Sequence, residues 1–216
     1  MRRSEIVQQI MTSGAVAVIR MADSQKLMKV AEAIRKGGVT SLEITMTTPN
    51  ALQVIETCVR EMGTDMLVGV GSVLDEETAR LAILAGAQYI VSPVLKEDII
   101  RMAHRYDKAV MPGAFTPTEI ITAQEFGADI IKIFPADVVG MPFFKAVKAP
   151  MPHVNLMPTG GVSLTNAGQW LKAGACAVGV GSSLLDNGAI ANEKYDVLTA
   201  NAKQLCASIS EARRES

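Results

Sequence analysis

The chain has 216 residues, of which 49% are hydrophobic and 20% are charged, and this composition is typical of a folded globular protein rather than a disordered or collagen-like one. At about 150 residues per average domain, the length predicts one large domain or two small ones. The chain is long enough to bury a hydrophobic core without the help of disulfide bonds or metal ions. The 21 basic and 22 acidic residues nearly cancel. This balance leaves no overall basic field for binding nucleic acid.

The cysteine count and the apolar runs indicate the compartment. Cys58, Cys176 and Cys206 are an odd number with no CxxC spacing, which argues against a disulfide framework and a structural zinc site and favours a reducing compartment. Polar residues interrupt the N-terminal segment, so it has no signal-peptide core. The longest uncharged apolar run, residues 173–181, is about half as long as a membrane-spanning helix. We therefore expect a cytoplasmic protein with no membrane segment.

Short runs rich in valine and isoleucine alternate with longer helical patterns, which predicts βα units and a parallel sheet. A helix at about residues 4–12 precedes the first unit. The predicted strands lie at residues 15–20, 41–46, 67–71, 89–92, 109–112, 130–133, 154–157 and 176–180. Thr48-Pro49 and Thr116-Pro117 each predict a helix start with threonine at the N-cap, and Glu119 completes a capping box with Thr116.

A weak internal repeat favours a closed barrel. Gly-Ala pairs at Gly86, Gly127 and Gly174 introduce the fourth, sixth and eighth strands, about two βα units apart, as expected for alternating layers of a barrel. We predict an α/β protein, a (β/α)8 TIM barrel with an extra N-terminal helix, formed by a single domain of residues 1–216. About 27 residues per unit is near the lower limit for this fold. An open doubly wound sheet is the alternative, but no GxGxxG follows the first strand.

Lys132 and Glu43 are charged residues inside mostly apolar strands. Burial disfavours the charged form of a lysine, so its amine becomes a nucleophile toward carbonyl groups. A glutamate beside it would supply the proton transfers that imine chemistry needs. Two structural alternatives remain open: the lysine head reaches water while its stem packs, or the two residues form a buried ion pair that has no catalytic role.

Glycine-rich loops follow the last two predicted strands, at residues 157–162 and 178–183. Glycines allow backbone N–H groups to approach an anion closely, and the loops after strands seven and eight of a barrel commonly bind phosphate. The alternative is that these glycines only form tight turns. His104 and His153 show no ligand spacing to an acidic residue or a cysteine, so we expect no metal and no other cofactor.

Motifs along nearly the whole chain resemble those of the class I aldolases that cleave 2-keto-3-deoxy-6-phosphogluconate and often 4-hydroxy-2-oxoglutarate. The resemblance rests on the order and spacing of residues 38–45 (GVTSLEIT), 68–73 (VGVGSV), 92–93 (SP), 111–113 (MPG), 131–136 (IKIFPA), 158–162 (PTGGV) and 180–182 (VGS). It implies a barrel that assembles as a homotrimer and acts on a small-molecule 2-keto acid without a metal.

The resemblance also implies the roles of individual residues. Lys132 would be the Schiff-base lysine and Glu43 the general acid/base. Substrate-binding residues would be Thr45, Thr47, Ser72, Pro93, Phe134 and Thr159, and phosphate-binding residues would be Gly160, Gly161, Gly181 and Ser182. Ser72 replaces a threonine that is more usual in this family and keeps its hydroxyl.

One position departs from the family pattern. Some members have arginine four residues after the glutamate, where it binds the substrate carboxylate, whereas this chain has Thr47. We expect Arg20, at the end of the first strand, to supply that cation, because a guanidinium fork matches a carboxylate. Two functional alternatives remain: a sugar-phosphate isomerase using Glu43 and Lys132 as acid and base, and a non-catalytic protein that binds a phosphorylated ligand.

Overall fold

The computed structural model describes residues 1–21 and 23–215, so Ala22 and Ser216 of the predicted domain lie outside the described residues. The strands are β1 (Ala15–Ile19), β2 (Ser41–Thr45), β3 (Leu67–Gly71), β4 (Tyr89–Val91), β5 (Ala109–Met111), β6 (Gly113–Ala114), β7 (Ile131–Ile133), β8 (Leu156–Pro158) and β9 (Val178–Val180). The helices are α1 (Arg3–Ser13), α2 (Ser24–Lys36), α3 (Ala51–Met62), α4 (Glu76–Leu84), α5 (Glu97–Arg105), α6 (Pro117–Glu125), α7 (Ala136–Lys148), α8 (Ala167–Lys172), α9 (Asn187–Ala191) and α10 (Tyr195–Arg214).

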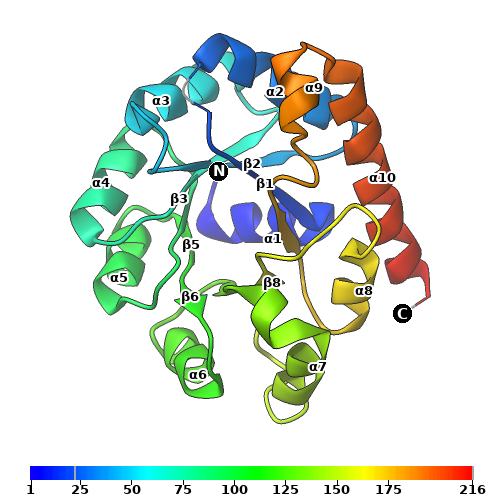
Figure 1. The fold of residues 1–216 in the computed structure, drawn as a ribbon. Coiled ribbons are helices and arrows are strands. Elements are labelled where there is room, and N and C mark those ends of the chain that lie inside the picture. Colours follow the sequence, from blue (N-terminus) through cyan, green and yellow to red (C-terminus); the bar gives the residue numbers. More distant parts are fainter. Residues whose placement is uncertain (22, 216) are drawn as a thin grey trace.

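The strands form a curled, all-parallel arrangement surrounded by helices (Figure 1). One sheet has the order β5-β4-β3-β2-β1-β9 and the other β6-β7-β8. Isolated parallel bridges, Leu156 with Ala175 and Thr159 with Gly179, link the β8 region to the β9 region. The first strand therefore pairs with the last, which the open doubly wound alternative does not provide. The predicted α/β class and the predicted strands are confirmed, although the fifth strand continues past Pro112 as the short strand β6.

Period-two alternation along the strands separates an inner cluster from an outer layer. Leu42, Ile44, Val68 and Val70 belong to the outer cluster between strands and helices. The inner cluster contains Val16, Leu67, Tyr89, Val91, Ala109, Met111, Ile130, Met157 and Ala177, together with Ile6 and Ile10 of α1. The N-terminal helix thus buries two isoleucines against the inner face of the curled sheet.

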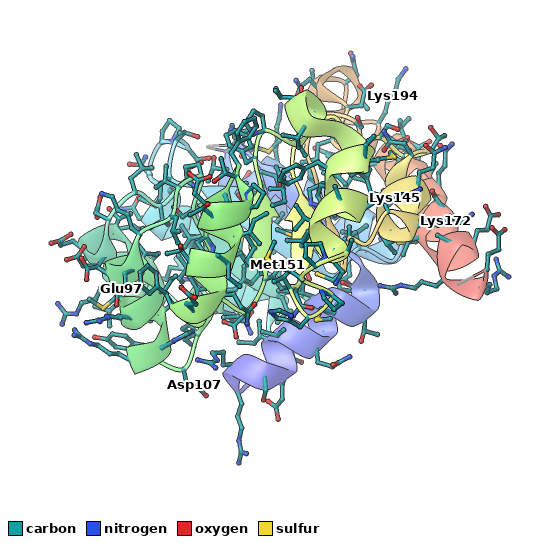
Figure 2. All side chains as sticks on the ribbon, turned by 90° about the horizontal axis from the view of Figure 1, so that it is seen from below. Glu97, Asp107, Lys145, Met151, Lys172 and Lys194 are labelled. Carbon is teal, nitrogen blue, oxygen red and sulfur yellow. The ribbon has the colours of Figure 1, made fainter. Side chains whose placement is uncertain are left out.

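Helix α1 lies across one end of the strands. Figure 2, which views the molecule from below, shows α1 crossing this end. The labelled Glu97, Lys145 and Lys172 mark α5, α7 and α8 in the surrounding layer of helices. Arg213 at the end of α10 donates hydrogen bonds to the carbonyl groups of Met11 and Thr12, in the last turn of α1. These carbonyls have no partner within their helix, so the arginine satisfies them and joins the two ends of the chain.

The helix boundaries confirm one predicted start and correct another. Thr116 caps α6, with its hydroxyl accepting from the Glu119 N–H at 3.2 Å and Glu119 completing the capping box. The predicted start at Thr48-Pro49 is wrong, because α3 begins at Ala51 after Asn50. The Thr48 N–H instead donates to the Thr45 carbonyl at 2.9 Å and its side chain is buried. Thr48 therefore closes a turn after β2.

The described residues contain no helix with the length and apolar character needed to cross a bilayer. Within the same part of the chain, no group of three or more His, Cys, Asp or Glu residues is arranged to hold a metal ion.

Burial predicts slow chemistry at the thiol of Cys58. Its side chain is fully buried, and burial raises the pKa of Cys58 to about 12. At pH 8 the native protein should therefore react at Cys58 at roughly one-hundredth of the rate of an unfolded thiol or less, because the thiolate is the nucleophile. Timed alkylation with mass mapping tests this, with half-buried Cys206 as the internal comparison. Labelling of Cys58 ahead of Cys206 in folded protein would contradict the prediction.

Candidate active site

Glu43 and Lys132 come together inside the curled sheet. Glu43 is the middle residue of β2 and Lys132 the middle residue of β7, and the apolar neighbours on both sides of each belong to the outer cluster. Alternation along the strands therefore turns both charged side chains inward. They are 1% and 5% exposed, and Lys132 Nζ lies 4.0 Å from Glu43 Oε1. The predicted charged pair is present, at a separation longer than a hydrogen bond.

The position of the Glu43 carboxylate depends on a glycine in the neighbouring strand. A Cβ atom at Gly71 would lie 1.9 Å from Glu43 Oε1 and 2.5 Å from its Cδ, a separation that no side chain tolerates. Thr159 has a similar relation to Gly179, where a Cβ would lie 2.5 Å from the threonine Oγ1. Two glycines thus provide the space for two of the predicted site residues, as a bulkier residue at either position could not.

Phe134 connects the lysine to an open pocket. The Lys132 ammonium lies 5.2 Å from the centroid of the Phe134 ring, which is within the range of a cation–π contact. The ring is 40% exposed and forms part of the wall of a pocket of about 370 Å³. A ligand in this pocket therefore meets the aromatic residue that covers the lysine.

The pocket is lined mainly by the loops after β8 and β9. Its residues are Val18, Arg20, Phe134, Thr159, Gly160, Gly161, Val162, Ser163, Gly179, Gly181, Ser182 and Ser183. Gly160 and Gly161 have φ values of 102° and 70°, which side chains rarely adopt, and their α-carbons lie close to Asp137 at the start of α7. Small residues and backbone therefore form most of the surface around Arg20.

The structure separates the predicted site residues into two groups. Arg20, Phe134, Thr159, Gly160, Gly161, Gly181 and Ser182 share this pocket, with Lys132 and Glu43 on its inner side. Thr45, Thr47, Ser72 and Pro93 follow or end β2, β3 and β4 and do not line the pocket. Thr45 is buried with its hydroxyl 2.8 Å from that of Thr47, which is exposed. Ser72 adopts a left-handed φ of 59°.

Three residues near the site were missed by sequence reasoning. Ser163 lines the pocket, Asp137 packs under its glycines, and Tyr89 of β4 is fully buried in the inner cluster. Burial, and then the negative charge of Glu43, raise the pKa of Tyr89 well above its ordinary value. The phenol is therefore neutral at any working pH, and its hydroxyl is available as a donor. Strand alternation could have placed Tyr89 inside, because it follows the same inward pattern as Val91.

Comparison with known proteins identifies the family. The family model described as "Aldolase: KDPG and KHG aldolase" matches residues 6–201. The chain belongs to this family. KDPG and KHG stand for the phosphogluconate and hydroxy-oxoglutarate substrates named above, and the predicted class, a Schiff-base aldolase and hence a lyase, is confirmed at the level of the family. Membership also weighs against the isomerase and the non-catalytic alternatives.

Individual relatives agree with this assignment over most of the chain. The 2-dehydro-3-deoxy-6-phosphogalactonate aldolase of Escherichia coli (strain K12) is 35% identical over 78% of this chain and 83% of its own length. The KDPG aldolase of Legionella pneumophila, captured with pyruvate as a covalent carbinolamine intermediate, is 26% identical with a TM-score of 0.85, covering 92% of this chain and 97% of that one. A designed cube-shaped cage made by fusing symmetric oligomeric domains is 30% identical with a TM-score of 0.85, covering 94% and 74%.

Proposed function

We propose that this family member cleaves 2-keto-3-deoxy-6-phosphogluconate to pyruvate and glyceraldehyde 3-phosphate, with Lys132 as the nucleophile and Glu43 as the general acid/base. The observation that carries the proposal is the buried Lys132–Glu43 pair, 4.0 Å apart, beside a pocket lined by glycine-rich loops. At this spacing the amine and the carboxylate do not share a hydrogen bond, so the amine is not tied to the carboxylate and a substrate bound to Lys132 comes within reach of Glu43.

The residues would act in a fixed order. The neutral Lys132 amine attacks the C2 keto carbon, and Glu43 transfers the protons as the resulting carbinolamine loses water to give an iminium. Glu43 then removes the C4 hydroxyl proton, the C3–C4 bonding electrons move to the iminium, and the aldehyde leaves. The enamine carbon C3 takes a proton back, and water hydrolyses the iminium to release pyruvate and the free amine.

The pocket would bind the rest of the substrate. The phosphate would be bound by backbone N–H groups and a hydroxyl of the pocket residues Gly160, Gly161, Gly181 and Ser182. Because the phosphate is far from the reacting carbon, binding it would fix the orientation of the substrate. Phe134 and Thr159 line the same pocket, and the Phe134 ring lies next to Lys132, so these two residues would contact the pyruvoyl part. Thr45, Thr47, Ser72 and Pro93 would complete the pyruvoyl site from the neighbouring strands.

Borohydride reduction with and without pyruvate tests the covalent step. Reduction of an iminium fixes pyruvate on the amine, and intact mass with peptide mapping locates it. An adduct on Lys132 that requires pyruvate is the expected result. The absence of an adduct in folded protein would reject the proposed function. Turnover of the gluconate and galactonate phosphates and of 4-hydroxy-2-oxoglutarate, measured side by side, then ranks the substrates.

Arg20 is the proposed cation for the substrate carboxylate. It is exposed on the pocket wall, on the inner side of the sheet next to Gly181 and Ser182. Loss of a hydrogen bond between charged groups should raise the pyruvate concentration for half-maximal trapping by about tenfold or more in Arg20→Ala. Arg101→Ala, an exposed arginine on α5, is the matched control. An effect confined to phosphorylated substrates would instead assign Arg20 to the phosphate, and unchanged trapping and kinetics would remove it from the site.

We also propose that both sheets are parts of one closed (β/α)8 barrel, with α1 as an extra N-terminal helix, and that residues 1–216 form a single domain. The β1–β9 pairing and the bridges between the β8 and β9 regions support closure. We propose a homotrimer in the cytoplasm, in keeping with the free cysteines and with the symmetric oligomeric domains of the designed relative. Light scattering should give about three times the 23.0 kDa chain mass, and a monomer or dimer would contradict it.

A further inference from the structure

Three polar atoms of fully buried, inward-facing residues of β2 and β4 lack a hydrogen-bond partner among the described residues. They are Ser41 Oγ and Glu43 Oε2 of β2 and the Tyr89 hydroxyl of β4. All three residues are at most 1% exposed. A buried polar atom without a partner costs free energy, so such a group requires an explanation.

The strands bring Tyr89 toward Glu43. Glu43 pairs in register with Gly69 of β3, and the next residue of β3, Val70, pairs with Ile90 of β4. Gly69 therefore stands between Glu43 and Tyr89. A Cβ atom at Gly69 would lie 2.3–2.4 Å from three atoms of the Tyr89 ring, so the ring occupies the space beside this glycine on the way to β2. The charge of Glu43 reaches the phenol, since it adds to the rise of the tyrosine pKa.

The groups around the carboxylate divide into a cation and neutral donors. Lys132 of β7 faces Glu43 Oε1 at 4.0 Å, whereas Oε2 has no partner in the part of the chain that the structure describes. Tyr89 is the titratable group that reaches the carboxylate from β4, and β3 presents Gly69 and Gly71. Ser41 shares the inward face of β2 and contributes a neutral hydroxyl. A water bound by these two hydroxyls and the carboxylate oxygen would have the two to four polar partners that a buried water requires.

We propose that Tyr89 is a positioning residue for the aldolase reaction, donating a hydrogen bond to the Glu43 carboxylate through a buried water that Ser41 also binds. This inference rests on the proposed role of Glu43. The phenol holds the carboxylate facing the lysine side, so that it is in place to accept the C4 hydroxyl proton. Tyr89 itself touches no substrate and is closed off by the inner cluster.

Tyr89→Phe removes only the oxygen and tests the proposal. Loss of the donor leaves the carboxylate free to turn away from the reacting hydroxyl, so kcat should fall by about tenfold. KM should stay within about twofold, and pyruvate trapping on Lys132 should still reach completion, because neither depends on a fast proton transfer at C4. Tyr106→Phe, an exposed tyrosine after α5, is the matched control and should leave all of these unchanged.

A double-mutant cycle separates positioning from packing. Tyr89→Phe should have no further effect on the residual turnover of Glu43→Gln, whereas a packing defect would lower it by the same factor in both backgrounds. Ser41→Ala is the second variant if Tyr89→Phe does not fold, and it should lower kcat by a smaller factor. An unchanged kcat in the folded variants would overturn the proposal. A wild-type protein that neither traps pyruvate nor cleaves substrate would instead reject the proposed function.

Discussion

Replacement of Lys132 by methionine is expected to abolish pyruvate-dependent trapping and to lower kcat by about 10⁴-fold or more, the scale of loss when a catalytic nucleophile is removed. Methionine has a similar length and no charge, so it suits the buried position between the outer-facing Ile131 and Ile133. Single-turnover assays and mass mapping after borohydride measure both effects.

The matched control is Lys172→Met, which removes an exposed lysine from α8. Its trapping and turnover should equal those of the wild type. Glu43→Gln should still be trapped by pyruvate, but turnover should be slower by about 10²- to 10⁴-fold, because the amine is intact and the proton transfer is not. Normal turnover in Lys132→Met would refute the covalent mechanism, and normal turnover in Glu43→Gln would remove Glu43 from it.

Gly71→Ala is expected to have the second largest effect, although the residue carries no functional group. The new methyl group would overlap Glu43 Oε1, so the carboxylate must leave its position. We expect kcat to fall by about 10²- to 10⁴-fold, as in the loss of a general acid/base. We also expect overpacking to lower the free energy of unfolding by about 1–3 kcal/mol. Steady-state kinetics and chemical denaturation measure the two quantities.

The combination Gly71→Ala with Glu43→Ala isolates the cause. Shortening Glu43 removes the atoms that the methyl group meets, so Gly71→Ala should cost little further stability in this background and should not change the residual turnover. Gly188→Ala in α9, where a Cβ would lie 3.2 Å from Asp186 Oδ1, is a glycine control away from the site. An equal loss of stability in both backgrounds would show that Glu43 is not what the methyl group displaces.

The strands were predictable because burial on both faces gives each one a short apolar run. Glu43 and Lys132 were predictable for the same reason, since a charge within such a run gains nothing from packing. The role of Thr48 was not predictable from the sequence. A Thr-Pro pair looks the same whether the threonine caps a helix or is buried in a turn, as Thr48 is after β2. The difference lies in tertiary contacts that a local pattern does not contain.

The pocket was only partly predictable. The glycine-rich loops indicated an anion site, and the structure places Gly160, Gly161, Gly181 and Ser182 around Arg20. Asp137 could not be predicted, since it meets these glycines through the start of a different helix. Tyr89 has the apolar body expected of a core residue, so its relation to Glu43 depends on the absence of a side chain at Gly69.

The pairing of β1 with β9 has a consequence for synthesis of the chain. On the ribosome, β1 emerges among the first twenty residues, whereas the strand that pairs with its free side begins at Val178. Until then one edge of β1 presents unpaired N–H and C=O groups, and such an edge can pair with a strand of another chain. In a chain that stops before β9, this edge of β1 therefore stays unpaired. We expect premature termination to yield aggregates rather than a smaller folded enzyme.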